Sequence, residues 1–176
     1  AFTILPVYKA IGLTLASEMT KPESFEWYNS IFEYISKLLP LTQTSLAYGI
    51  PNIYSGGFIF IMLPLFLINS KISTRKKFTY SALVAFLYAS MNLNILNYIW
   101  HGLHFPNQLP GRWTFIFSFV VILICYETLI NIKGISYKGV FFSLFHALLF
   151  ITIIENFPEK LSVGSKIIDI MFIGML

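Results

Sequence analysis

Apolar runs alternate with short polar breaks along the whole chain, and this alternation predicts helices that cross a membrane. A spanning helix needs about 20 mostly apolar residues to cross about 30 Å of hydrocarbon. Complete spans are predicted at residues 53–69, 78–93, 112–131 and 139–154, with partial spans at 1–17 and 167–176. The pattern therefore indicates an all-α fold, a polytopic transmembrane helical bundle forming one partial transmembrane domain over residues 1–176.

Residues 25–39 show a different pattern, because apolar side chains recur there at spacings of three and four while Glu and Ser side chains occupy the other side. Ser24 precedes this segment as a helix start, and Pro40 ends it. The pattern predicts an amphipathic helix lying in the membrane interface. An ordinary packed helix of an extramembrane domain is the alternative, because periodicity alone does not separate the two.

Two short basic turns set the expected orientation of the bundle. Residues 70–77 and 132–138 contain no acidic residue, and their cations are Lys71, Arg75, Lys76, Lys77, Lys133 and Lys138. Cytoplasmic loops of membrane proteins carry an excess of Lys and Arg. We therefore expect both turns to be cytoplasmic, and the loop at residues 94–111 to be extracytoplasmic.

Composition supports a membrane protein and excludes other classes. Hydrophobic residues make up 56% of the 176 residues and charged residues 11%, which leaves too little polar surface for a soluble domain. The net charge of +4 does not indicate nucleic-acid binding, because the cations stand at the ends of apolar runs and line no face. The single cysteine, Cys125, excludes an intramolecular disulfide. Ala1 begins directly in an apolar segment without a signal-peptide n-region, so we expect the chain to be an internal piece of a longer polypeptide.

The outer loop and its borders concentrate the candidate chemistry. Arg112, at the start of a span, fits either an interfacial anchor or a phosphate clamp, because a guanidinium stays charged and presents a planar fork of donors. His101 and His104 fit hydrogen bonding to a sugar or phosphate oxygen, or to loop carbonyls. No nearby Asp, Glu or Cys completes a metal-binding set, so no cofactor is identified and the chain gives no support for a divalent metal.

The remaining polar and aromatic candidates each have a structural alternative. Trp100 and Trp113 are typical of the aromatic belt at a membrane border, with stacking on a sugar ring as the other possibility. Asn107 could orient substrate hydroxyls or cap a turn. His146 lies within a predicted span, where an ionisable group is costly and marks a candidate functional position, or else bonds to a neighbouring helix.

The order and spacing of two motifs resemble a known family. GIPNIYSGG at residues 49–57 and NYIWHGLHFPNQLPGRWTFIFSF at residues 97–119 are similar to the middle region of the YfhO-type bacterial membrane proteins. Where this chain has Gly111, that family most often has an aromatic residue, and Thr114 stands where Ser is commoner. The resemblance implies a GT-C-like glycosyltransferase in the bacterial cell membrane. Such an enzyme moves a sugar from a polyprenyl-phosphate donor to an envelope polymer such as lipoteichoic acid on the outer face.

The resemblance also guides the assignment of roles. It favours Arg112 as a phosphate contact over an anchor, and it adds Tyr54, which precedes a span on the same outer side. In GT-C enzymes the first outer loop carries the catalytic acidic residue, which we expect to precede Ala1. Glutamates of the chain itself are the alternative source of a base: Glu18, Glu23, Glu26 and Glu33.

Two rival functions remain open at the level of sequence. A lipid flippase or transporter also needs cationic and aromatic groups at a membrane mouth, and it would use polar groups within spans, such as His146 and Asn92. A structural subunit of a larger membrane complex would tolerate substitution throughout the outer loop.

Overall fold

The computed structural model describes residues 4–11, 22–40, 42, 45, 49–103 and 111–155, and this part of the chain is helical. Its one β-type pairing is a single antiparallel bridge between Trp27 and Leu93. The helices are α1 (Ile4–Ile11), α2 (Ile31–Ser36), α3 (Ile59–Ile68), α4 (Thr74–Asn92), α5 (Asn94–Trp100), α6 (Phe115–Ile130), the 3₁₀ turn η2 (Ile132–Gly134) and α7 (Tyr137–Glu155). The predicted all-α class is confirmed for these residues.

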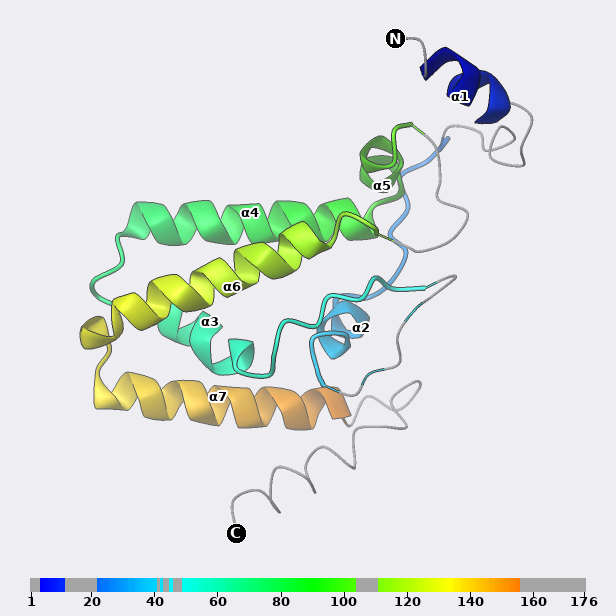
Figure 1. Cartoon of the computed structure of the whole chain (residues 1–176). Coiled ribbons are helices and arrows are strands. Elements are labelled where there is room, and N and C mark those ends of the chain that lie inside the picture. Colours follow the sequence, from blue (N-terminus) through cyan, green and yellow to red (C-terminus); the bar gives the residue numbers. More distant parts are fainter. Residues whose placement is uncertain are drawn as a thin grey trace.

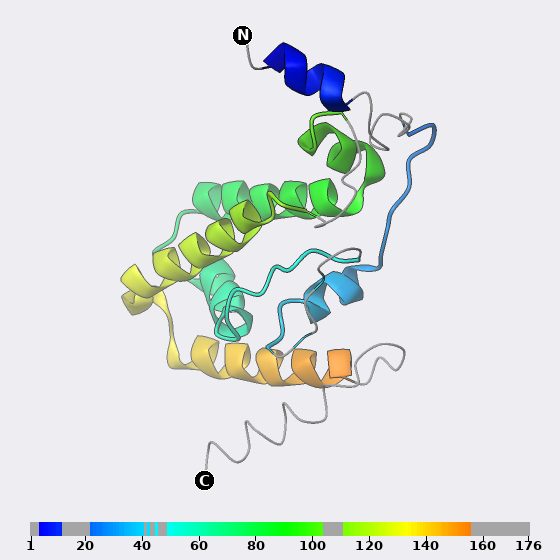
Figure 2. The same cartoon turned by 45° about the vertical axis from the view of Figure 1, so that its right-hand side comes forward.

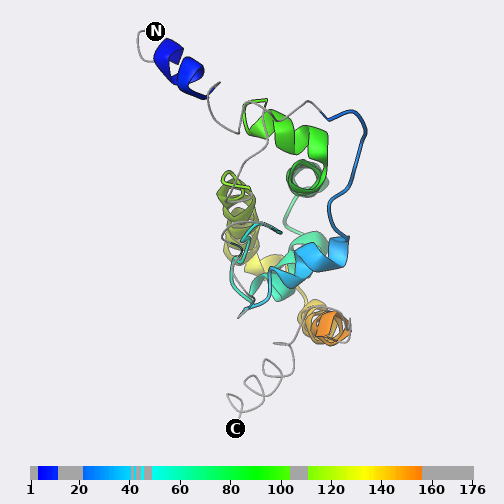
Figure 3. The ribbon, with the colours of Figure 1, turned by 90° about the vertical axis from the view of Figure 1, so that its right-hand side faces the viewer.

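The long helices form a bundle with α3 between α6 and α7. Helix α4 lies beside α6, and α3 contacts both α6 and α7 (Figures 1 and 2). The connections from α3 to α4 and from α6 to α7 lie at one end of the bundle, whereas α2 and α5 lie at the other end. A view along the helices shows α3 and α2 filling the space between α4, α6 and α7 (Figure 3). The two predicted basic turns therefore lie at the same end.

Small side chains explain how α7 approaches α3. Gly139, Ser143 and Ala147 recur every four residues on α7, so they share one helix face, and all three are buried. A Cβ atom added at Gly139 would lie 2.9 Å from Ile68 Cδ1 of α3. Spacing of this kind lets two helix backbones pack closely, as is common between membrane helices.

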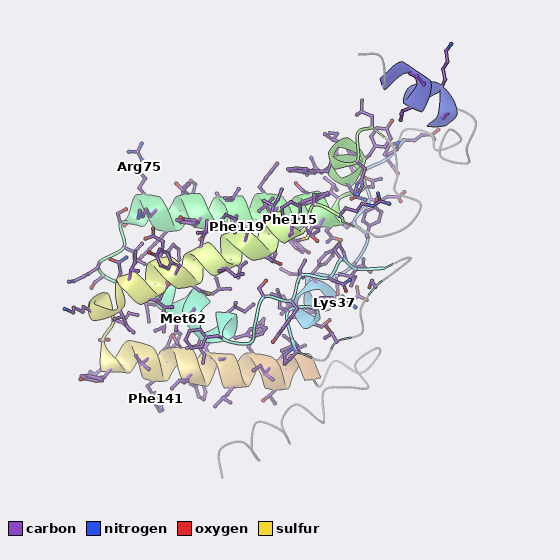
Figure 4. The ribbon with its side chains drawn as sticks, viewed as in Figure 1. Lys37, Met62, Arg75, Phe115, Phe119 and Phe141 are labelled. Carbon is purple, nitrogen blue, oxygen red and sulfur yellow. The ribbon has the colours of Figure 1, made fainter. Side chains whose placement is uncertain are left out.

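Helix α7 is the one helix among the described residues that is long and apolar enough to cross a membrane, over Tyr137–Ile154. Helices α3 and α6 are apolar but shorter, and Pro64 lies inside α3. Large apolar side chains on the outward sides of α6 and α7 are exposed, including Phe115, Phe119 and Phe141 (Figure 4). Such surfaces suit contact with lipid. Multiple crossings and their sidedness stay predictions.

The predicted spans and the observed helices differ at their ends. The helix expected within 53–69 begins only at Ile59: residues 51–56 form no regular secondary structure, and residues 57–58 form a turn. The helix expected at 78–93 begins earlier, at Thr74, where the Ser73 hydroxyl accepts a hydrogen bond from the Lys76 N–H and caps the first turn. The loop expected at 94–111 contains α5. The predicted partial span at 167–176 lies outside the described residues.

The predicted amphipathic helix at residues 25–39 is much shorter, and its predicted start at Ser24 is wrong. Helix α2 begins after Ser30, whose side chain and backbone form a capping box with Glu33. Both candidate N-cap residues, Ser24 and Ser30, are serines, so residue type alone does not show which of them begins the helix. Ser30 is followed three residues later by Glu33, which completes a capping box, and this spacing distinguishes Ser30 from Ser24.

Two asparagines hold residues 24–29 in an extended path instead of a helix. The Asn94 side chain accepts from the Glu26 N–H at 3.2 Å and donates to the Ser24 carbonyl at 2.8 Å. The Asn92 side chain accepts a hydrogen bond from the Asn29 N–H at 3.0 Å and donates one to the Asn29 carbonyl at 2.9 Å. Because these contacts satisfy backbone groups that a helix would use internally, local helical periodicity is overridden.

Candidate functional site

Helix α5 ends in a tight reversal that places the first candidate residue, His101. The backbone is left-handed at Gly102 (φ +72°) and at Leu103 (φ +65°), and the Leu103 N–H donates to the Tyr98 carbonyl at 3.0 Å. A left-handed residue directly after a helix is a common way to end it. The chain therefore turns sharply at the point where the loop begins.

The His101 ring is held by its own helix. Its Nδ1 lies 2.8 Å from the carbonyl oxygen of Asn97. A carbonyl oxygen only accepts, so Nδ1 carries the proton, and in the neutral ring Nε2 is left with a free lone pair. This Nε2 is buried and has no hydrogen-bond partner in the part of the chain that the structure describes. An unpaired buried acceptor costs free energy, and it suits a hydroxyl group that donates to it.

Trp100 and Trp113 stack on each other across the loop. Their ring centroids are 4.5 Å apart and their planes differ by 16°. Trp113 is 7% exposed whereas Trp100 is 39% exposed. The Nε1 donor of Trp113 is also buried without a partner among the described residues. The pair joins the end of α5 to the start of α6, and one face of Trp113 is already covered by Trp100.

Arg112 is exposed and stands between two buried neighbours, Gly111 and Trp113. Gly111 has φ +62°, and a Cβ atom there would lie 2.6 Å from Thr114 Cγ2 and 2.7 Å from Pro51 Cγ. The backbone of Gly111 therefore packs directly on Pro51. This contact fixes the backbone that carries the exposed Arg112 side chain.

The two sequence motifs meet at this point. Besides the contact of Gly111 with Pro51, the Ser118 hydroxyl of α6 donates to the Ile53 carbonyl at 3.4 Å. Ile53 is fully buried, and the next residue, Tyr54, is exposed. Tyr54 thus lies on a segment that packs against the start of α6.

The other candidates have different placements. His104 and Asn107 lie outside the described residues. His146 is exposed on α7, where its ring stacks on Phe150 with centroids 5.7 Å apart. The Asn92 side chain, besides its bonds to Asn29, donates to the Tyr88 hydroxyl at 2.9 Å. His146 and Asn92 therefore share no contact that would mark a common path through the bundle.

Two of the carboxylates near this end have structural partners. Glu33 completes the capping box of α2, and Glu26 accepts from the Ser24 hydroxyl at 2.8 Å. Among the described residues no group of three or more His, Cys, Asp or Glu side chains could hold a metal ion. The described part of the site consequently offers one exposed cation, an unpaired acceptor, an unpaired donor and an exposed tyrosine, and Glu23 is its exposed carboxylate without a structural role.

Sequence reasoning missed two features of this site. The unpaired Nε1 of Trp113 depends on packing that no motif records. The second feature is the bracing of the nearby chain by Asn92 and Asn94: the sequence suggested Asn92 only as a polar group within a span, and Asn94 only as a polar residue at the end of that span. A polar pair at a helix end, facing a segment with strong helical periodicity, is the signal that could have revealed them.

Comparison with known proteins identifies the family. The family model described as bacterial membrane protein YfhO matches residues 1–173. No curated protein and no solved structure matches the chain. The matched residues include both motifs that meet at Gly111 and Pro51, and the predicted resemblance is confirmed.

Proposed function

The chain belongs to the family of the bacterial membrane protein YfhO, and we propose that it forms the donor-binding part of a membrane glycosyltransferase. The reaction transfers a sugar from a polyprenyl-phosphate donor to a cell-envelope polymer such as lipoteichoic acid. Transfer takes place on the outer face of the bacterial cell membrane, where the loop at 94–111 opens, with the turns at 70–77 and 132–138 in the cytoplasm. The membrane lipid, the donor, the acceptor polymer and the remainder of a longer polypeptide are its partners.

The observation that supports this proposal most is the placement of Arg112. Its guanidinium is exposed, while the adjacent Gly111 and Trp113 are buried in the junction of the two motifs. The junction lies at the end of the bundle opposite the basic turns. A donor phosphate sits where its polyprenyl chain ends and water begins, and a guanidinium there offers a planar fork of charged donors.

His101 takes a different role from Arg112. Because Nδ1 donates to Asn97, the neutral ring offers an acceptor at Nε2, which would repel a phosphate oxygen and attract a hydroxyl. We therefore assign His101 to a sugar or acceptor hydroxyl and Arg112 to the phosphate. His104, Asn107, Trp100 and Tyr54 are assigned to the same substrate surface on the resemblance.

The transfer balances as a displacement at the anomeric carbon. An acceptor hydroxyl oxygen forms the new bond to that carbon, and the bond from the carbon to the phosphate oxygen breaks. The polyprenyl phosphate leaves with the electron pair, and Arg112 stabilises the charge that develops on it. A carboxylate outside the described residues takes the hydroxyl proton, since Glu26 and Glu33 have structural partners, and the exposed Glu23 is the alternative base among the described residues.

The test compares single variants of the intact protein in membranes. Arg112→Ala should abolish transfer while expression and folding stay unchanged, and Arg112→Lys should retain part of it, because an ammonium keeps the charge but loses the bidentate geometry. His101→Gln, whose amide oxygen can accept a hydrogen bond, should retain more activity than His101→Phe. Undiminished transfer by Arg112→Ala would exclude the phosphate clamp.

A further inference from the structure

The two basic turns are joined into one surface by hydrogen bonds that sequence patterns do not reveal. The backbone N–H and the hydroxyl of Ser70 both donate to the Gly134 carbonyl, at 3.0 and 2.9 Å. The fully buried Asn69 donates from its side chain to the Asn131 carbonyl at 3.0 Å, and its side-chain oxygen accepts from the Lys71 N–H at 2.9 Å. The connection between α3 and α4 is therefore fixed to the connection between α6 and α7.

Gly134 makes this junction possible. A Cβ atom at this position would overlap the side-chain oxygen of Asn69 and would lie 2.8 Å from the Lys71 backbone nitrogen. No side chain larger than hydrogen fits there without displacing those groups. The spacing between the two turns is thus set by packing at Gly134, and the cations on both turns have a defined relative position.

The surface of this junction is strongly cationic. Lys71, Arg75, Lys76, Lys133 and Lys138 are exposed, and Lys77 is half-buried. Arg75 projects away from the bundle at the start of α4 (Figure 4). The acidic side chain described at this end is Glu127, and it pairs with Lys76 at 2.9 Å. The other glutamates whose side chains the structure describes lie in residues 23–33, towards the opposite end.

Exposed apolar side chains adjoin these cations. Phe78 on the first two turns of α4 is 75% exposed, and Tyr137 at the start of α7 is 96% exposed. Both lie where the helices begin, and α7 is the helix long enough to cross a membrane. Cations beside exposed aromatic side chains at a helix end match the boundary between lipid headgroups and acyl chains.

We propose that the joined turns, which we call the basic junction, form a binding site for the headgroup of an anionic phospholipid. The cations supply the contacts to the lipid phosphate, and Phe78 and Tyr137 lie against the part of the acyl chains that adjoins the headgroup. A lipid fits this surface better than a free anion, because the apolar side chains have no counterpart in an ion. The site is independent of the proposed sugar transfer, which uses the opposite end of the molecule.

Lipid selectivity measured by electron spin resonance tests the proposal. The intact protein is reconstituted in phosphatidylcholine with spin-labelled phosphatidylglycerol or spin-labelled phosphatidylcholine, and the motionally restricted fractions are compared. The wild-type protein should select phosphatidylglycerol. The triple variant Arg75→Gln, Lys133→Gln, Lys138→Gln should lose at least about tenfold of the relative association constant, since each juxtamembrane cation contributes roughly fivefold.

Matched variants separate charge from folding. The triple variant Arg75→Lys, Lys133→Arg, Lys138→Arg keeps the charge and should keep the selectivity. Lys9→Gln removes one exposed cation from α1 and should leave the lipid selectivity unchanged. Equal affinity of the wild-type protein for the two lipids, or full selectivity in the neutral triple variant, would overturn the proposal. Displacement of phosphatidylglycerol by an equal concentration of pyrophosphate would overturn the lipid assignment in favour of a free phosphate site.

Discussion

Gly111 provides a sensitive test of how the site is built, because two separate physical effects act on it. Its left-handed backbone costs any residue with a Cβ about 1–2 kcal/mol. The added Cβ of Gly111→Ala would also lie 2.6 Å from Thr114 and 2.7 Å from Pro51, both of which are buried. Neither a proline ring nor a β-branched side chain yields easily, and overpacking of this kind costs about 1–3 kcal/mol. The expected loss of stability is therefore about 2–5 kcal/mol.

Gly102→Ala is the matched control. Its backbone is equally left-handed, at φ +72°, but no atom of the described residues lies within 4 Å of an added Cβ. Its free energy of unfolding should fall only by the backbone contribution of about 1–2 kcal/mol. The two variants should thus differ by about 2 kcal/mol, or roughly 4–8 °C in Tm for a domain of this size.

The assay is thermal unfolding of the purified intact protein in detergent, followed by tryptophan fluorescence, because Trp113 lies two residues from the substitution. Gly111→Ala should also lower sugar transfer more than Gly102→Ala does, since it moves the backbone that carries Arg112. Equal Tm values for the two variants would refute the contact between Gly111 and Pro51, and with it the junction of the two motifs.

Two further predictions concern the framework around the site. Asn92→Leu removes the side-chain hydrogen bonds that hold the segment before α2. The free energy of unfolding, measured by thermal unfolding, should fall by about 1–3 kcal/mol. Asn52→Ala, at an exposed position, should lower it less. A normal Tm together with impaired lipid movement would instead support a transport role for Asn92. Ser143→Leu should push α7 away from α3 and lower stability by about 1–3 kcal/mol, while Leu148→Ala on the exposed face of α7 should have a much smaller effect. Similar Tm values for these two variants would contradict the packing of α7 through its small residues.

The helical class and the positions of the long helices were predictable because apolar runs dominate this sequence. The turns at 70–77 and 132–138 were placed at one end by their charge, and the hydrogen bonds of Ser70 and Asn69 are consistent with that placement. Helix ends were less predictable. The extended path of residues 24–29 depends on Asn92 and Asn94, which lie more than sixty residues away along the chain. Local periodicity carries no information on contacts at such separation.

The meeting of the two motifs was predictable from the sequence, whereas the contacts of the individual candidate residues were not. The resemblance brought the two motifs together, and Arg112 is exposed as a substrate contact requires. Gly111 appeared in the sequence only as a departure from the family pattern. The structure gives it a physical reason, since its left-handed backbone lies against Pro51. The role proposed for His101 rests on the orientation of its ring, which depends on a single hydrogen bond to Asn97.

The central claim is that the protein consumes a lipid-linked sugar and does not merely move it across the membrane. The most direct measurement uses the purified intact protein in proteoliposomes with a polyprenyl-phosphate sugar carrying a radiolabel in the sugar. We predict that label passes to the acceptor polymer, that one polyprenyl phosphate is released for each sugar transferred, and that Arg112→Ala stops both. Label that crosses the bilayer while still attached to its lipid, with no polyprenyl phosphate released, would contradict the account.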